Sequence, residues 1–166
     1  DDTTAFCFEL PAMEETFTPL ATIPQLAGYL PLPDNNYTAV AIISSSNEPT
    51  NHMIRDISAM AGDFEKYPVE FSFLLRNDTE LIQFVSGNRR PLPKNLTLKV
   101  DKGQKVESLI TSALAAAGLM PAEGEAQLPL LVMVNKKGEV VYFSSGYRIG
   151  TGYQISKYLV STGTNE

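Results

Sequence analysis

Residues 44–52, with the sequence SSSNEPTNH, contain the side chains of this chain that come nearest to a catalytic set: three serines, a threonine and the chain's single histidine. A hydroxyl group with a histidine as its base is a common arrangement for nucleophilic attack. On a helix, however, the two-residue spacing of Thr50 and His52 points their side chains about 200° apart. No acid follows at a spacing that would orient the imidazole ring. The pattern therefore disfavours a hydroxyl nucleophile, which is kept as an alternative.

The composition is that of one globular domain with room for a substantial core: 43% of the 166 residues are hydrophobic and 19% are charged. A net charge of -6 offers no basic surface for phosphate backbones, so we expect no nucleic-acid partner. Arg89, Arg90 and Lys94 form a short basic cluster that prolines interrupt, and we interpret it as a solvated loop. No apolar run approaches the roughly 18 residues that cross a bilayer, so we expect no membrane span.

Cysteine and histidine are too few for the usual metal and disulfide sites. Cys7 is the chain's one cysteine and cannot form an internal disulfide. The carboxylates of Glu14, Glu15, Asp63 and Glu65 show no calcium-loop pattern, and we expect neither a metal nor a cofactor. The chain begins with DDTTAFCF, without an initiator methionine or an apolar leader, which is typical of a processed protein or an excised part of a longer one.

Hydrophobic patterns in the first half predict a strand, a helix and a second strand. Residues 37–43 (YTAVAII) form a continuous run of β-formers, as does the stretch 69–76 (VEFSFLLR). Between them an apolar stripe at helical spacing comprises Met53, Ile57, Met60, Ala61 and Phe64. A helix that connects two strands in this way makes them parallel.

The second half predicts a helix, a hairpin and a final helix. A short helix over 78–85 and a strand over 96–100 come first, and an apolar stripe over 106–117 then predicts a helix that Gly118 and Pro121 close. The stretches LPLLVMV and VVYF flank NKKGE, in which Gly138 suits the positive φ of a hairpin turn. The last predicted helix, 151–160, buries Ile155, Tyr158 and Leu159.

Residues 1–36 follow a different pattern, and we separate them as an N-terminal extension from a main domain over 37–166. Phe6, Phe8 and Leu10 alternate with polar or small residues, which predicts a short strand with Cys7 on its opposite face. Five prolines between residues 11 and 34 prevent regular helices. We expect an ordered loop or a pair of short strands packed on the main domain.

The order of elements over residues 37–161 resembles that of thioredoxin, and in particular of the periplasmic thiol-disulfide oxidoreductases and resolving proteins. Three stretches carry the resemblance: AIISSSNEPTNHM, LPLLVMVNKKGEVVYFSSG and GYRIGTGYQISKYL. They match the family's redox turn, proline-led hairpin and final helix. The resemblance implies a three-layer α/β/α sandwich with a mixed central sheet. It also implies a cis-proline at Pro129, after Leu128.

At the redox turn the chain departs from the family. The positions that match the Cys-x-x-Cys motif hold Asn47, Glu48, Pro49 and Thr50, so both thiols are missing. Disulfide exchange requires a thiolate, which neither an amide nor a hydroxyl replaces. We therefore assign no catalytic residue, and we expect Asn47 to act as the N-cap of the following helix.

Relatives hold an extended substrate peptide beside this turn. The resemblance thus suggests a groove for a partner chain, formed by Asn47, His52, Leu128, Pro129 and Gly146. Our leading hypothesis is a non-catalytic module that binds a partner protein or a neighbouring domain of its own chain. Similar cysteine-less domains end secreted bacterial multidomain proteins, which suggests a periplasmic or extracellular location. One alternative is a thiol-disulfide oxidoreductase that uses Cys7 or a partner's cysteine, and another is a domain that only packs against its neighbours.

Overall fold

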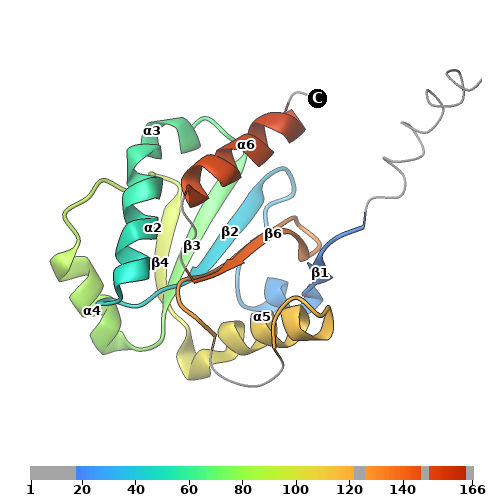
Figure 1. Ribbon diagram of the computed structural model, residues 1–166, viewed down its shortest axis with the longest axis horizontal. Helices are drawn as coiled ribbons and strands as arrows, with labels where there is room; N and C mark the ends of the chain where they lie inside the picture. Colours follow the sequence, from blue (N-terminus) through green and yellow to red (C-terminus); the bar gives the residue numbers. More distant parts are fainter. Residues whose placement is uncertain (1–17, 122–125, 147–149, 164–166) are drawn as a thin grey trace, which may run out of the picture.

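A six-stranded mixed sheet forms the middle layer of the protein (Figure 1). The computed structural model describes residues 18–121, 126–146 and 150–163, and the side chains of all of these except 160–163. In the sheet order β1-β6-β5-β2-β3-β4, strands β2, β3 and β4 are parallel, while β5, β6 and β1 add antiparallel pairs. The strands are β1 (Ala21–Thr22), β2 (Tyr37–Ile42), β3 (Val69–Leu75), β4 (Leu96–Val100), β5 (Leu130–Val134) and β6 (Glu139–Ser145).

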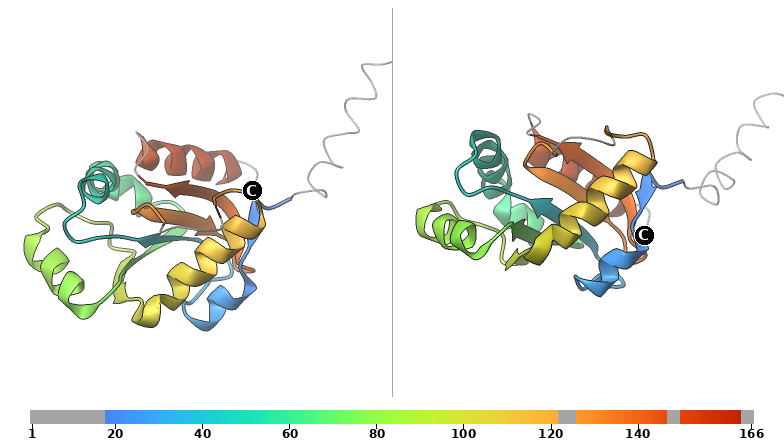
Figure 2. Two further views of the ribbon diagram at one scale, coloured as in Figure 1. Left: turned by 60° about the horizontal axis from the view of Figure 1, so that its bottom comes forward. Right: turned by 90° about the horizontal axis from the view of Figure 1, so that it is seen from below.

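Helices cover both faces of the sheet, as Figure 2 shows. They are α2 (Glu48–Ala59), α3 (Ala61–Phe64), α4 (Asp78–Gly87), α5 (Lys105–Ala116) and α6 (Thr151–Gly163), with the 3-10 turns η1 (Pro24–Gly28) and η2 (Lys102–Gln104). On one face the side chains of Ile57 and Ile155, from α2 and α6, share a core with β3. On the other face Leu26 and Ile110, from η1 and α5, share a second core with β2. These three layers confirm the predicted fold class.

The burial and the pairing of the central strands agree with the patterns in their sequence. Four successive residues of β2, from Ala39 to Ile42, are fully buried, because both faces of this strand are covered by helices. The crossover through α2 makes β2 and β3 parallel, with Ala39 opposite Phe71. The hairpin turn between β5 and β6 contains Gly138 at a φ of 77°. The predicted parallel pair and the predicted positive φ at Gly138 are both confirmed.

Two predictions about the helices are wrong in detail. The apolar stripe predicted for one helix is divided at Met60, whose φ of -114° and ψ of 14° leave the helical range. Gly62 disfavours helix beyond this point. The separate single turn α3 then places Phe64 in the core, where it is buried. On α6, Tyr158 is half-buried and packs edge-on against Tyr37, with ring centroids 5.6 Å apart. Partial burial raises the pKa of the Tyr158 hydroxyl above its usual range, and a hydrogen bond with Tyr37 adds to this effect.

The segment before β2 packs on the main sheet. Strand β1 pairs with β6, and the N–H of Ile23 donates to the carbonyl of Gly138 over 2.7 Å. A Cβ atom at Gly138 would lie 2.3 Å from the Ile23 carbonyl oxygen, so this contact requires glycine. The side chains of Ile23, Leu26 and Leu30 are buried in the core. The predicted strand over 5–10, including Cys7, lies outside the described residues, and the domain boundary at residue 36 stays a prediction.

Candidate functional site

The turn between β2 and α2 is built around the side chain of Asn47. Its backbone is extended, and its Oδ1 accepts a hydrogen bond of 2.9 Å from the N–H of Thr50. This satisfies one of the N–H groups that a helix start leaves without a partner, and such a cap contributes about 1 kcal/mol. Glu48 and Pro49 occupy the first turn, where a negative charge and a proline are both favourable. The prediction that Asn47 caps this helix is confirmed.

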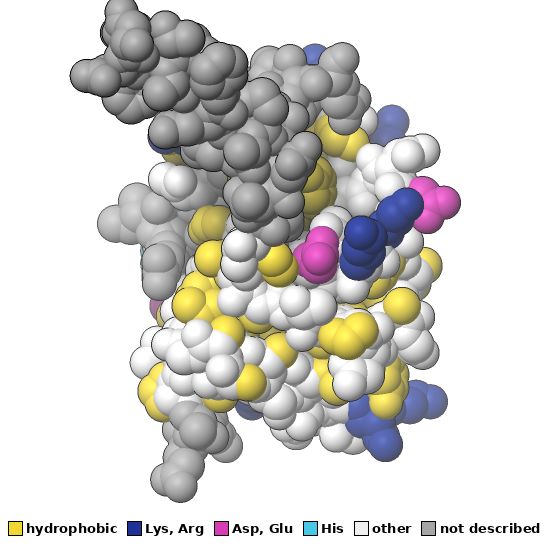
Figure 3. Space-filling view, turned by 90° about the vertical axis from the view of Figure 1, so that its right-hand side faces the viewer, with side chains coloured by type: hydrophobic (Ala, Val, Ile, Leu, Met, Phe, Trp, Pro, Cys, Tyr) yellow, Lys and Arg dark blue, Asp and Glu magenta, His cyan; other side chains and the backbone are white. Residues whose placement is uncertain are grey.

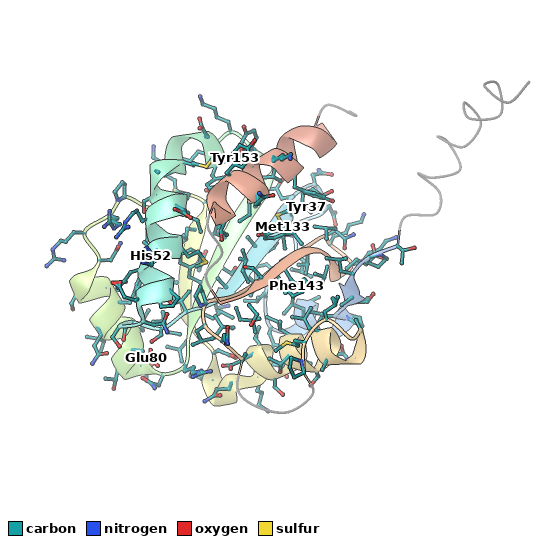
Figure 4. The ribbon with its side chains drawn as sticks, viewed as in Figure 1. Tyr37, His52, Glu80, Met133, Phe143 and Tyr153 are labelled. Atoms are coloured by element: carbon teal, nitrogen blue, oxygen red, sulfur yellow. The ribbon has the colours of Figure 1, made fainter. Side chains whose placement is uncertain are left out.

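Thr50 and His52 lie in different surroundings. The side chain of Thr50 is fully buried, and its hydroxyl oxygen accepts the N–H of Ser44 over 3.3 Å. His52 lies half-buried on α2 (Figure 4). Its Nδ1 is 3.4 Å from Nη1 of Arg55. A substrate cannot reach the Thr50 hydroxyl without opening the turn. The arrangement is that of a structural threonine.

Facing this turn, two segments of the hairpin lie side by side. The Leu128–Pro129 peptide bond, for which the family resemblance implies a cis geometry, is cis. The N–H of Gly146 donates to the carbonyl oxygens of Gln127 and Pro129, both over 3.0 Å. Gly146 has a φ of 75°, and a Cβ atom there would lie 2.9 Å from Oε1 of Gln127. The close approach of the two segments thus depends on glycine at this position.

Between the turn and the hairpin lies a pocket of about 790 Å³, which we call the hairpin pocket. Its walls are formed by Ser44, Asn47, Glu48, Pro49, His52, Arg76, Ala126, Gln127, Leu128, Ser145 and Gly146. The structure therefore brings together four of the five residues suggested for a groove. The fifth, Pro129, is buried and does not line the pocket.

Arg76 brings a positive charge to this wall, and Glu107 balances it. The guanidinium donates to both carboxylate oxygens, from Nε over 2.9 Å and from Nη2 over 2.7 Å. Glu107 is itself buried, and its N–H and that of Val106 donate to the carboxylate of Asp101, each over 2.9 Å. The end of β3 and the start of α5 are thereby joined by charged hydrogen bonds.

Comparison with known proteins rests on structure, because no family model and no curated protein sequence matches the chain. A candidate thioredoxin from Neisseria meningitidis is similar over 90% of this chain and 95% of its own, with 18% identity and a TM-score of 0.57. StoA from Bacillus subtilis is similar over 76% and 84%, with 13% identity and a TM-score of 0.52. The fold is thioredoxin-like.

A third thioredoxin-like structure is a secreted Mycobacterium tuberculosis disulfide oxidoreductase homologous to E. coli DsbE. It is similar over 77% of this chain and 83% of its own, with 12% identity and a TM-score of 0.52. At these identities the similarity establishes the shared fold alone. What this thioredoxin-like domain does must be argued from its own side chains.

Within the described ranges of this thioredoxin-like chain, three or more His, Cys, Asp and Glu side chains nowhere gather as they would to hold a metal ion. No helix among these residues is long and apolar enough to cross a membrane.

Sequence reasoning missed Arg76 and Glu107, because they are 31 positions apart and the distance between them depends on the fold. The signal that was available is that Arg76 is the last residue of the strand predicted over 69–76, at the strand end where ligands bind in parallel sheets. Gln127 and Ser145 were also missed. They lie next to predicted groove residues, but nothing in their type distinguishes them.

Proposed function

We propose that this domain is a catalytically silent binding module that holds an extended segment of a partner protein in the hairpin pocket. The observation that carries the proposal is that both motif positions serve the fold. Asn47 caps α2, and the buried hydroxyl of Thr50 accepts a hydrogen bond from the N–H of Ser44 in the turn. An open pocket remains beside them. In this proposal the two residues occupy the cysteine positions of redox relatives and supply no nucleophile.

The main chain of Leu128 supports the mode of binding. Its N–H and C=O make no hydrogen bond with the described part of the chain, and the residue lines the hairpin pocket. Unpaired backbone groups beside a pocket can accept an extended peptide as an added strand. Such binding requires neither a thiol nor a metal.

A peptide library selected on the intact chain tests this proposal. Gln127 is exposed and lines the pocket, so Gln127→Trp should fill the pocket without disturbing the core. We expect selected peptides to bind this variant at least about tenfold more weakly, which corresponds to about 1.4 kcal/mol. The matched control is Ser112→Trp, which places the same ring at an exposed position of α5. Equal binding to both variants would overturn the proposal.

The proposal extends to context: the domain belongs to a larger, exported protein in the periplasm or outside the cell. The support is the resemblance of its sequence to exported relatives, together with one similar structure that is described as secreted. The full-length reading frame tests this. An export signal and an adjoining domain are expected, and a cytoplasmic protein without either would contradict it.

The alternative, an oxidoreductase that uses Cys7 or a partner's cysteine, differs in a measurable way. The silent module should not reduce insulin in the presence of a thiol reductant above the uncatalysed rate. Turnover that Cys7→Ser abolishes would establish the alternative.

A further inference from the structure

A second pocket, of about 680 Å³, lies between α2 and α4, and we call it the arginine pocket. Arg55 of α2 lines one side, and Arg89 and Arg90, which follow α4, line the other. They are three of the five arginines in the whole chain, and none of its eight lysines lines this pocket. Figure 1 shows α2 and α4 as neighbours at one side of the molecule.

The charges of these three arginines are not balanced by carboxylates among the residues that the structure describes. None forms a salt bridge with a carboxylate in the described part of the chain. Arg55 contacts His52, and Arg89 donates to the carbonyl of Ser86 over 2.6 Å, which leaves most of their N–H donors available. Among the described residues of the wall, Glu48 is the one that is acidic.

The concentration of positive charge is local, because the whole chain carries a net charge of -6. On the side of the molecule shown in Figure 3, the visible basic side chains are scattered, and some lie beside acidic ones. An acidic protein with a local arginine-rich pocket is poorly suited to a long polyanion such as nucleic acid. It is better suited to a compact anion that reaches all three guanidinium groups.

We propose that the arginine pocket binds a small molecule that carries two or more oxyanion groups, either phosphates or carboxylates. The planar fork of a guanidinium group matches both in a bidentate way. Amide side chains of Asn51, Gln83 and Asn88 on the same wall add neutral donors. The volume is within the range of small-ligand sites, about 300–1,000 Å³. Of the basic cluster interpreted from sequence as a solvated loop, Arg89 and Arg90 thus contribute to the proposed site together with Arg55, whereas Lys94 does not line the pocket.

Calorimetric titration of the intact chain with pyrophosphate and with citrate, at constant ionic strength, tests the proposal. We expect saturable binding of at least one of them. Arg89→Gln combined with Arg90→Gln should weaken it by about tenfold or more, because charge-assisted hydrogen bonds are lost. The matched control, Lys136→Gln combined with Lys137→Gln, removes the same charge from the distant β5–β6 turn and should change the affinity by less than about twofold.

A second measurement does not depend on the variants. Amide chemical shifts of the unchanged protein should move in α2 and in residues 83–90 on addition of the bound anion. Preference for pyrophosphate identifies a phosphate ligand, and preference for citrate a polycarboxylate. The proposal is overturned if neither anion saturates, if shifts occur elsewhere, or if the lysine control loses as much affinity as the arginine variant. It is independent of peptide binding in the hairpin pocket, so either proposal can fail alone.

Discussion

The hairpin pocket and the arginine pocket are neighbours at the start of α2, and Glu48 belongs to both walls. In the hairpin pocket the arginine of the wall, Arg76, is held by the buried carboxylate of Glu107. In the arginine pocket three arginines line the wall without a carboxylate partner in the described residues. The same residue type thus has two uses. An arginine that is paired with a buried carboxylate supports the fold. An arginine without a carboxylate partner is available to a ligand.

The largest expected effect is a gain of activity in the hairpin pocket. Asn47→Cys combined with Thr50→Cys should give measurable insulin reduction where the unchanged protein gives none, because a thiolate at a helix N-terminus is stabilised. The measurement is turbidity of reduced insulin with a thiol reductant. The single substitution Asn47→Cys serves as control and should remain silent. A silent double variant that is folded would show that the pocket lacks more than its thiols.

Removing the carboxylate that balances Arg76 should have the next largest effect. We expect Glu107→Ala to lower the free energy of unfolding by about 2 kcal/mol in urea titration. A fully buried pair would cost 3–5 kcal/mol, but the side chain of Arg76 is 25% exposed. Replacing Arg76 and Glu107 together by methionine should recover part of this loss. A loss below about 0.5 kcal/mol for Glu107→Ala would mean that the pair has no structural role.

The helix cap should contribute less. Asn47→Ala is expected to cost about 1 kcal/mol in free energy of unfolding, whereas Asn47→Asp should be nearly neutral because its carboxylate can cap as well. Asn51→Ala removes the same amide from an exposed position one turn later and should cost less than about 0.5 kcal/mol. If Asn47→Ala and Asn51→Ala have equal stability, the cap is not a stabilising contact in this protein.

The smallest effect on stability is expected at the arginine pocket. Arg89→Gln with Arg90→Gln should change the free energy of unfolding by less than about 0.5 kcal/mol, because both side chains are exposed and carry no ion pair in the described part. Urea titration beside Glu107→Ala provides the comparison. A loss as large as that of Glu107→Ala would show that these arginines serve the fold.

The predictions that succeeded depend on neighbours in sequence. The Asn47 cap is determined within three residues, and the turn at Gly138 within five. The parallel pair β2–β3 follows from the length of the segment between them. The residues that sequence reasoning missed depend on distant parts of the chain. Arg55 and Arg89 are 34 positions apart in the sequence, and the packing of α2 beside α4 brings both to the wall of one pocket.

The break at Met60 shows a different limit. A hydrophobic stripe records which side chains are buried but does not record whether the backbone between them is continuous. Phe64 is buried as the stripe predicts, although it belongs to a separate turn. The hydrophobic periodicity thus predicts which side chains are buried in the core, but it does not predict where the helix ends.

The pairing of β1 with β6 has a consequence for the order of folding. Ala21 is opposite Val140, so this contact joins residues separated by most of the chain, whereas β5 and β6 are joined by one short turn. Closing a long loop costs more conformational entropy than closing a hairpin. We expect β1 to dock after the rest of the sheet has formed and to detach first. In native-state hydrogen exchange the amide of Ile23 should lose protection before the amides of β2 and β5.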